Sequence, residues 1–100
     1  MKVKPYRDYH EGLIESLKEP QEAQAYLDAV LEEGDEKLFL KALKNVAEAR
    51  GGIGKAAAKT KLNRESLYKM LSAKGNPKLT SLEALLDYFG LRLSVQRKPH

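Results

Sequence analysis

The segment from Ile53 to Leu71 constrains the fold more than any other part of the chain, because it predicts two short helices joined by a tight turn. Its sequence is IGKAAAKTKLNRESLYKML. The first helix offers the methyl groups of Ala56 to Ala58 where a crossing helix must approach, and Leu62 closes the turn as an apolar plug. Asn63 is a strong N-cap for the second helix, in which Leu67 faces the same interior. This spacing is typical of a helix-turn-helix that reads DNA.

The second helix of this motif is predicted to read the DNA sequence. Its apolar residues fall on one side and leave the polar side chains on the other. Arg64 and Lys69 can donate hydrogen bonds to guanine O6 and N7, and Glu65 can accept one from cytosine N4. The alternatives are that Glu65 pairs with Lys61 or Lys69, or that the polar side is an ordinary solvated helix face.

Residues around this second helix are candidates for contacts with the sugar-phosphate backbone. Gly54 and Lys55 begin the first helix, where free amides and the positive end of the helix dipole attract a phosphate. Tyr68 is expected to contact sugar or phosphate. Further candidates bracket the second helix: Lys59, Lys61, Lys74, Asn76 and Lys78. Such contacts position a protein on DNA but do not select the DNA sequence. For each lysine, the alternative is a role in solubility alone.

Charge divides the chain into an acidic part and a basic part. Residues 8–36 contain ten acidic residues and the single base Lys18, whereas residues 51–78 contain seven bases and the single acid Glu65. A basic surface suits double-stranded DNA, and an acidic surface is repelled by it. We therefore expect the acidic part to face away from DNA or to engage a basic partner.

Apolar periodicity predicts further helices before the motif. A short amphipathic helix is expected over residues 9–18, a second from Pro20 to the C-cap Gly34, and a third from the N-cap Asp35 to Gly51. The expected apolar stripes are Ala23, Tyr26, Leu27, Val30 and Leu31 in the second helix, and Leu38, Phe39, Ala42, Leu43, Val46 and Ala49 in the third.

The C-terminal part predicts one helix and one strand. Residues 73–78 have a loop composition, Thr80 to Glu83 have capping-box spacing with a helix boundary two residues earlier as the alternative, and Gly90 is expected to end the helix. Alternation then predicts a short strand from Leu91 to Val95. Because a lone strand cannot satisfy its own backbone, we expect it to pair with a second copy or another protein. The dimerisation residues would be Leu91, Leu93 and Val95.

Several classes of function lack the residues they need. The chain contains no cysteine, and its two histidines, His10 and His100, lie near opposite ends. A disulfide framework, a thiolate zinc site and a histidine-activated nucleophile are therefore excluded, and we expect no enzymatic activity, no metal and no cofactor. The alternative is an acid-base pair among the carboxylates of the N-terminal half. The absence of a long apolar run or a signal-peptide pattern predicts a cytoplasmic protein without a membrane segment.

These observations predict an all-α fold of five to six helices. We expect a lambda-repressor-like helix-turn-helix domain with an N-terminal helical extension and a short C-terminal β-strand. The expected units are an acidic partner-binding extension over residues 1–34, a DNA-binding domain over residues 35–90, and a strand and tail over residues 91–100. One hundred residues can bury one modest core, so dimerisation would add stability.

Five short motifs occur in order along nearly the whole chain. They are YL at 26–27 followed by EEGD at 32–35, ALKNVAEARG at 42–51, NRESLY at 63–68, GNP at 75–77 and GLRLSV at 90–95. With these motifs the chain resembles the addiction-module antidote proteins, the helix-turn-helix antitoxins of the HigA-like type. The chain departs from the pattern at Lys61, where such motifs usually place glycine to accept a positive φ.

The resemblance implies an antitoxin of a type II toxin-antitoxin module that neutralises a RelE/ParE-like toxin and represses the shared operator as a homodimer. By position, Arg64, Glu65, Ser66 and Lys69 fall on the base-reading sites. Toxins of this kind are generally basic, so the expected partner surface is acidic: Glu22, Asp28, Glu32 and Glu33. The alternatives are a transcriptional repressor with no toxin and a protein-interaction adaptor without DNA binding.

Overall fold

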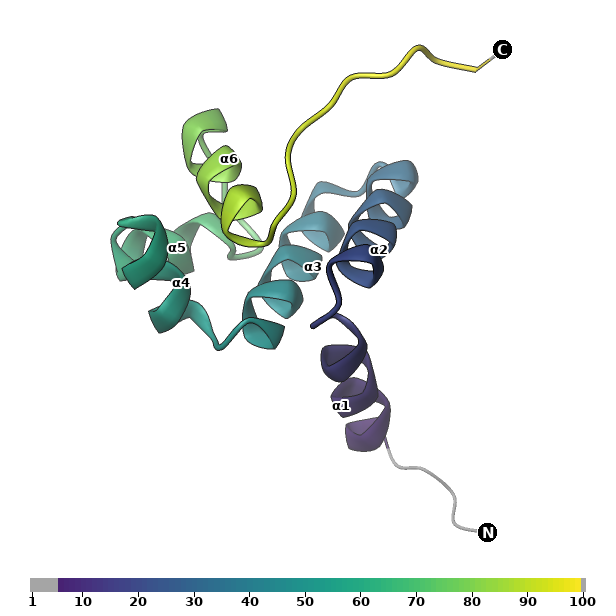
Figure 1. Cartoon of the computed structure of the whole chain (residues 1–100). Helices are drawn as coiled ribbons and strands as arrows, with labels where there is room; N and C mark the ends of the chain where they lie inside the picture. The colour runs from purple at the N-terminus through teal and green to yellow at the C-terminus, as the bar shows by residue number, and fades with distance from the viewer. Residues whose placement is uncertain (1–5, 100) are drawn as a thin grey trace, which may run out of the picture.

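The computed structural model describes residues 6–99, with side chains from residue 9 onward, and these residues form six α-helices (Figure 1). The helices are α1 (Tyr6–Ser16), α2 (Pro20–Glu33), α3 (Glu36–Ala49), α4 (Ile53–Thr60), α5 (Arg64–Met70) and α6 (Leu79–Tyr88). The expected all-α class and helix number are confirmed for this part of the chain. The first helix begins three residues before the expected residue 9. Residues 1–5 and His100, at the ends of the expected outer units, lie outside the described residues.

Helices α2 and α3 pack side by side, and local chemistry fixes the turn between them. Gly34 ends α2 with φ 73°, a left-handed conformation that glycine adopts without steric cost, and its N–H donates to the carbonyl of Leu31 over 3.1 Å. Asp35 then caps α3 by accepting a hydrogen bond from the Leu38 N–H over 3.1 Å. Both caps were expected from the sequence. The Asn45 side chain donates to the Tyr26 hydroxyl over 3.0 Å and joins the two helices.

One apolar core runs through all the helices of the described chain. Its most deeply buried large side chains are Leu17, Leu43, Val46, Leu67, Leu85 and Phe89. The expectation that the apolar stripes are buried is wrong at two positions, because Leu31 is 53% exposed and Leu38 is 39% exposed. Both lie beside the turn between α2 and α3, at the ends of their helices. Periodic spacing predicts which side of a helix is apolar, but not how far along that side the neighbouring helix reaches.

Helix α6 is attached to the C-terminal end of α3 by a pair of reciprocal hydrogen bonds. The Arg50 guanidinium donates to the carbonyl of Phe89 over 3.1 Å, and the Tyr88 hydroxyl donates to the carbonyl of Arg50 over 2.8 Å. The expected capping box at Thr80 is wrong, and the alternative boundary two residues earlier is confirmed, because the helix begins at Leu79 with Lys78 as its N-cap. Lys78 has extended backbone at φ −70° and ψ 150°, so Thr80 lies inside the first turn and its hydroxyl cannot cap.

The expected C-terminal strand is absent from the described residues. Residues 91–99 have no regular secondary structure and run away from the helices (Figure 1). Leu91 is half-buried, Leu93 is 41% exposed and Val95 is 96% exposed. The physical reason is that a strand is stabilised by hydrogen bonds to a neighbouring strand, and the described residues of a single chain supply none.

Candidate nucleic-acid interface

Helix α5 is short, capped and anchored on one side. The Asn63 side chain accepts hydrogen bonds from the backbone N–H groups of Glu65 over 2.8 Å and Ser66 over 3.2 Å, which confirms the expected N-cap. Leu67 is 1% exposed and Met70 is 7% exposed. Because α5 buries these residues and packs on α4, its remaining side is held toward solvent.

Helix α4 forms the support for α5 and α6. Ile53, Ala56 and Ala57 are buried, and α4 contacts both later helices. The small side chains let the helix axes approach closely, as expected. Ala58, however, is exposed, which corrects the expectation that all three alanines face the crossing helix. Three consecutive helical residues span 200° of the helix circumference, so they cannot all face one neighbour.

The turn between α4 and α5 has the geometry of a glycine position, although a lysine occupies it. Lys61 has φ 63° and ψ 17°, and among the described residues no other non-glycine residue has a positive φ. Thr60 supports the turn, because its hydroxyl donates to the carbonyl of Ala56 over 2.7 Å and accepts from the Leu62 N–H over 3.2 Å. The turn therefore has the left-handed conformation of the family pattern in spite of the lysine side chain.

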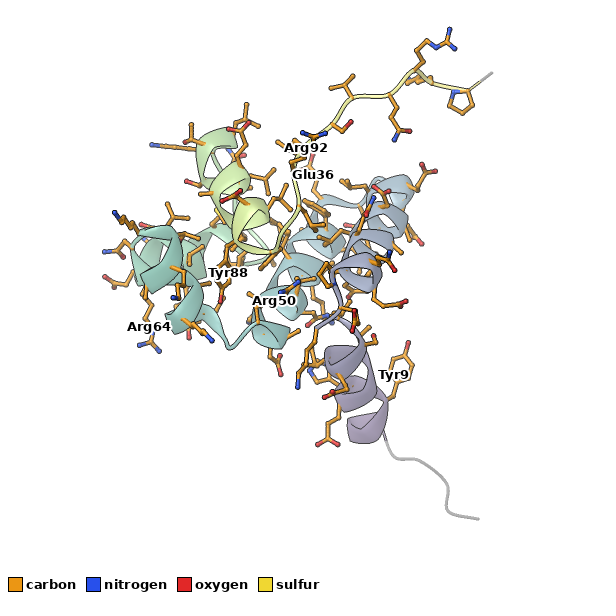
Figure 2. The ribbon with its side chains drawn as sticks, in the orientation of Figure 1. Tyr9, Glu36, Arg50, Arg64, Tyr88 and Arg92 are labelled. Carbon is orange, nitrogen blue, oxygen red and sulfur yellow. The ribbon has the colours of Figure 1, made fainter. Side chains whose placement is uncertain are left out.

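The four predicted base-reading residues, Arg64, Glu65, Ser66 and Lys69, are all exposed. The Arg64 guanidinium lies 5.8 Å from the centre of the Tyr68 ring, one helical turn away, which restrains a long side chain by a cation–π contact. Figure 2 shows Arg64 at the outer edge of the α4–α5 unit. Among the described side chains, no ion pair joins Glu65 to Lys61 or Lys69. This leaves the Glu65 carboxylate available to accept a hydrogen bond.

The predicted phosphate contacts fall into two groups. One group lines a hollow of about 470 Å³ beside α5, and its members are Lys61, Lys74, Asn76 and Lys78, together with the base-reading residues Ser66 and Lys69. The other group, Gly54, Lys55 and Lys59, lies exposed on α4. Tyr68 is 47% exposed on α5. The first group was scattered over eighteen residues of sequence, and the fold brings it together around one helix.

Gly75 makes this hollow possible. A Cβ atom at this position would collide with the carbonyl oxygen of Met70 and lie 2.8 Å from the carbonyl oxygen of Lys69. The loop after α5 can therefore fold back against the end of the helix only with a glycine here. This close contact places Lys74 and Lys78 beside the polar side of α5.

The four predicted partner-binding acids lie elsewhere. Glu22, Asp28, Glu32 and Glu33 are all exposed on α2. In Figure 1, α3 separates α2 from the α4–α5 unit. The acidic and basic parts of the sequence are thus on different sides of the folded chain, as the charge pattern predicted.

One basic feature was not among the residues predicted for the site. Lys37, Lys41 and Lys44 are exposed on α3 and line a second hollow of about 630 Å³ that ends at Leu71, Ser72 and Ala73. Their spacing of four and three residues places them on one face of a helix. That spacing could have been found in the sequence, but α3 lies outside the segment where basic residues outnumber acids most strongly.

Residues 6–99 contain neither a metal-binding cluster nor a membrane-spanning helix. No group of three or more histidine, cysteine, aspartate or glutamate side chains is placed to hold a metal ion. No helix is long and apolar enough to cross a membrane.

Comparison with known proteins identifies two similarities. Residues 10–97 match the family described as "Probable addiction module antidote protein". A relative from Haemophilus influenzae, described as "Uncharacterized protein", is 35% identical over 85 residues, which cover 85% of this chain and 87% of the relative. No solved structure matches the chain.

Proposed function

The chain belongs to the family of probable addiction module antidote proteins, and we propose that it is the HigA-like antitoxin of a type II toxin-antitoxin module. In this proposal it represses its own operator as a homodimer, neutralises a RelE/ParE-like toxin and catalyses no reaction. The observation that carries the proposal is the arrangement of α5, which buries Leu67 and Met70 and leaves Arg64, Ser66 and Lys69 exposed beside a lysine-lined hollow.

Operator recognition rests on the chemistry of the exposed side of α5. Arg64 and Lys69 would donate to guanine, and Glu65 would accept from cytosine, while the lysines of the hollow hold the phosphates. Two copies related by a two-fold axis would place their α5 helices about 34 Å apart, one turn of B-DNA. The operator is then an inverted repeat.

Dimerisation is assigned to the segment from Leu91 to Val95, in which Leu91 is half-buried and the following residues are exposed. Pairing of this segment with its copy across a two-fold axis would satisfy the backbone groups of both and cover Leu93 and Val95. The large exposure of these apolar side chains in one chain supports this assignment.

Toxin binding is assigned to the acidic surface of α2. Glu22, Asp28, Glu32 and Glu33 are solvent-facing, and a basic toxin would be steered toward them. The exposed side chain of Leu31 in the last turn of α2 offers an apolar contact inside this acidic surface.

The test is co-expression with the small open reading frame beside this gene. We expect the two proteins to co-purify and the growth arrest caused by the toxin alone to disappear. A variant with all four acids neutralised, E22Q/D28N/E32Q/E33Q, should associate with the toxin more slowly and bind operator DNA as before. An unchanged association rate would contradict the assigned toxin surface. Operator binding without any toxin partner would instead identify a repressor that acts alone.

A further inference from the structure

The three lysines of α3 form a cationic row that no role described above uses. Lys37, Lys41 and Lys44 follow each other at spacings of four and three residues, so they extend along one face of α3 over about 10 Å. Among the described side chains, no ion pair engages any of them. Their charges are therefore available to an anionic partner.

The two acids in the same hollow keep their negative charges, and each contacts a neighbouring group at one end of α3. Asp35 caps α3 by accepting the Leu38 N–H, and Glu48 lies 3.5 Å from the Nε2 atom of His10 on α1. The two acids lie at opposite ends of α3, and the lysines occupy the stretch between them. The centre of the row is consequently positive.

The hollow beside α3 is adjacent to the candidate DNA interface. It ends at Ser72 and Ala73, directly before Lys74, which lines the hollow beside α5. The loop from α5 to α6 thus separates two basic hollows, and their lysines form a track that leads from α5 across the loop to α3. Continuity with the lysines beside α5 favours the same type of partner for both parts of the track.

We propose that Lys37, Lys41 and Lys44 bind the phosphates of a DNA strand that leaves the groove occupied by α5, and so extend the footprint of the protein beyond its helix-turn-helix. A DNA strand carries one phosphate per 3.4 Å of helix axis, so a row of about 10 Å matches roughly three phosphates. This inference rests on the proposed DNA binding. It adds sequence-independent affinity and leaves base recognition to α5.

The test compares the unchanged protein with the variant K41A/K44A in binding to a fluorescently labelled short duplex of random sequence. Binding is measured by fluorescence anisotropy between about 50 and 200 mM salt, and the logarithm of the association constant is plotted against the logarithm of salt concentration. Loss of two phosphate contacts should reduce the magnitude of the slope by about 1.8, since each contact contributes about 0.9. The operator duplex should show the same reduction.

The matched control is K18A/K98A, which removes the same two charges from the N-terminal part and the tail. We expect its slope to match that of the unchanged protein. Both pairs of lysines are exposed, and far-UV circular dichroism verifies that each variant is folded.

The possible results separate this inference from the proposed function. If the unchanged protein shows no salt-dependent binding to any duplex, both fail. If it binds but K41A/K44A keeps the full slope, or loses no more than K18A/K98A does, the α3 footprint is wrong and the DNA-binding function stands. Loss of toxin association in K41A/K44A with an unchanged DNA slope would assign the row to a protein partner and would also overturn the inference.

Discussion

The left-handed lysine in the turn before α5 predicts that Lys61→Gly stabilises the protein. A non-glycine residue in this conformation costs roughly 1–2 kcal/mol, because its Cβ crowds the following carbonyl. Glycine removes that cost but gives the unfolded chain more freedom, which offsets about 0.4–1 kcal/mol. Lys61 is exposed, so its side chain contributes no buried contact that would be lost. The net gain should be about 0.5–1 kcal/mol.

Thermal unfolding followed by circular dichroism measures this gain. For a domain of this size, 1 kcal/mol shifts the midpoint by about 4–8 °C, so Lys61→Gly should raise Tm by about 2–8 °C. Lys61→Ala is the control, because it removes the same charge and keeps the Cβ atom, and its Tm should stay close to that of the unchanged protein. If the glycine variant melts at or below the alanine variant, backbone strain at the turn is refuted as a source of instability.

Three further predictions concern the interface and the dimer. Arg64→Ala should cost about 1–3 kcal/mol of binding free energy on the operator and little on random DNA. Lys59→Ala should weaken binding to both duplexes equally and reduce the magnitude of the salt slope by about 1. Equal losses for Arg64→Ala on both duplexes would remove Arg64 from the base-reading set. Gly75→Ala should destabilise the protein by about 1–3 kcal/mol, because the new Cβ meets the carbonyl of Met70. Urea denaturation measures this loss of stability. An unchanged denaturation midpoint would show that the loop has another arrangement. Leu93→Pro should yield monomers in sedimentation, since proline cannot donate a backbone hydrogen bond, and a persistent dimer would place the interface elsewhere.

The helices could be predicted from the sequence wherever a local rule determines them. Pro20, Gly34, Asp35 and Asn63 all occupy the cap or first-turn positions that their chemistry favours. The capping box at Thr80 failed because a second N-cap was available two residues earlier, and the spacing of a motif does not decide between such neighbours. The strand at residues 91–95 failed because alternation reports only which face is apolar, whereas a strand also needs a partner.

The candidate site was less predictable, because it depends on tertiary packing. The exposed residues of α5 follow from helical periodicity alone, which explains why the exposure of Arg64 and Lys69 could be predicted. The lysine row on α3 was not predicted because its lysines alternate along the sequence with buried residues such as Leu43 and Val46. A count of charges along the chain does not show that these lysines share one face of the helix. Only the fold shows that this row ends beside the loop that carries Lys74.

The position of α3 explains how one small chain could serve two oppositely charged partners. Helix α3 contacts α2 on one side and α4 on another, so it separates the acidic surface from the basic one. Without this separation, opposite charges on a short chain would neutralise each other. At about 0.1–0.15 M salt, a surface charge acts only over about 8–10 Å, so a separation of that size is enough. The body of α3 and its side chains span about that distance. In the proposed function its basic row would extend the side that binds DNA, and its packing against α2 supports the acidic side. In the proposed function, toxin and operator therefore approach different surfaces of the same protein.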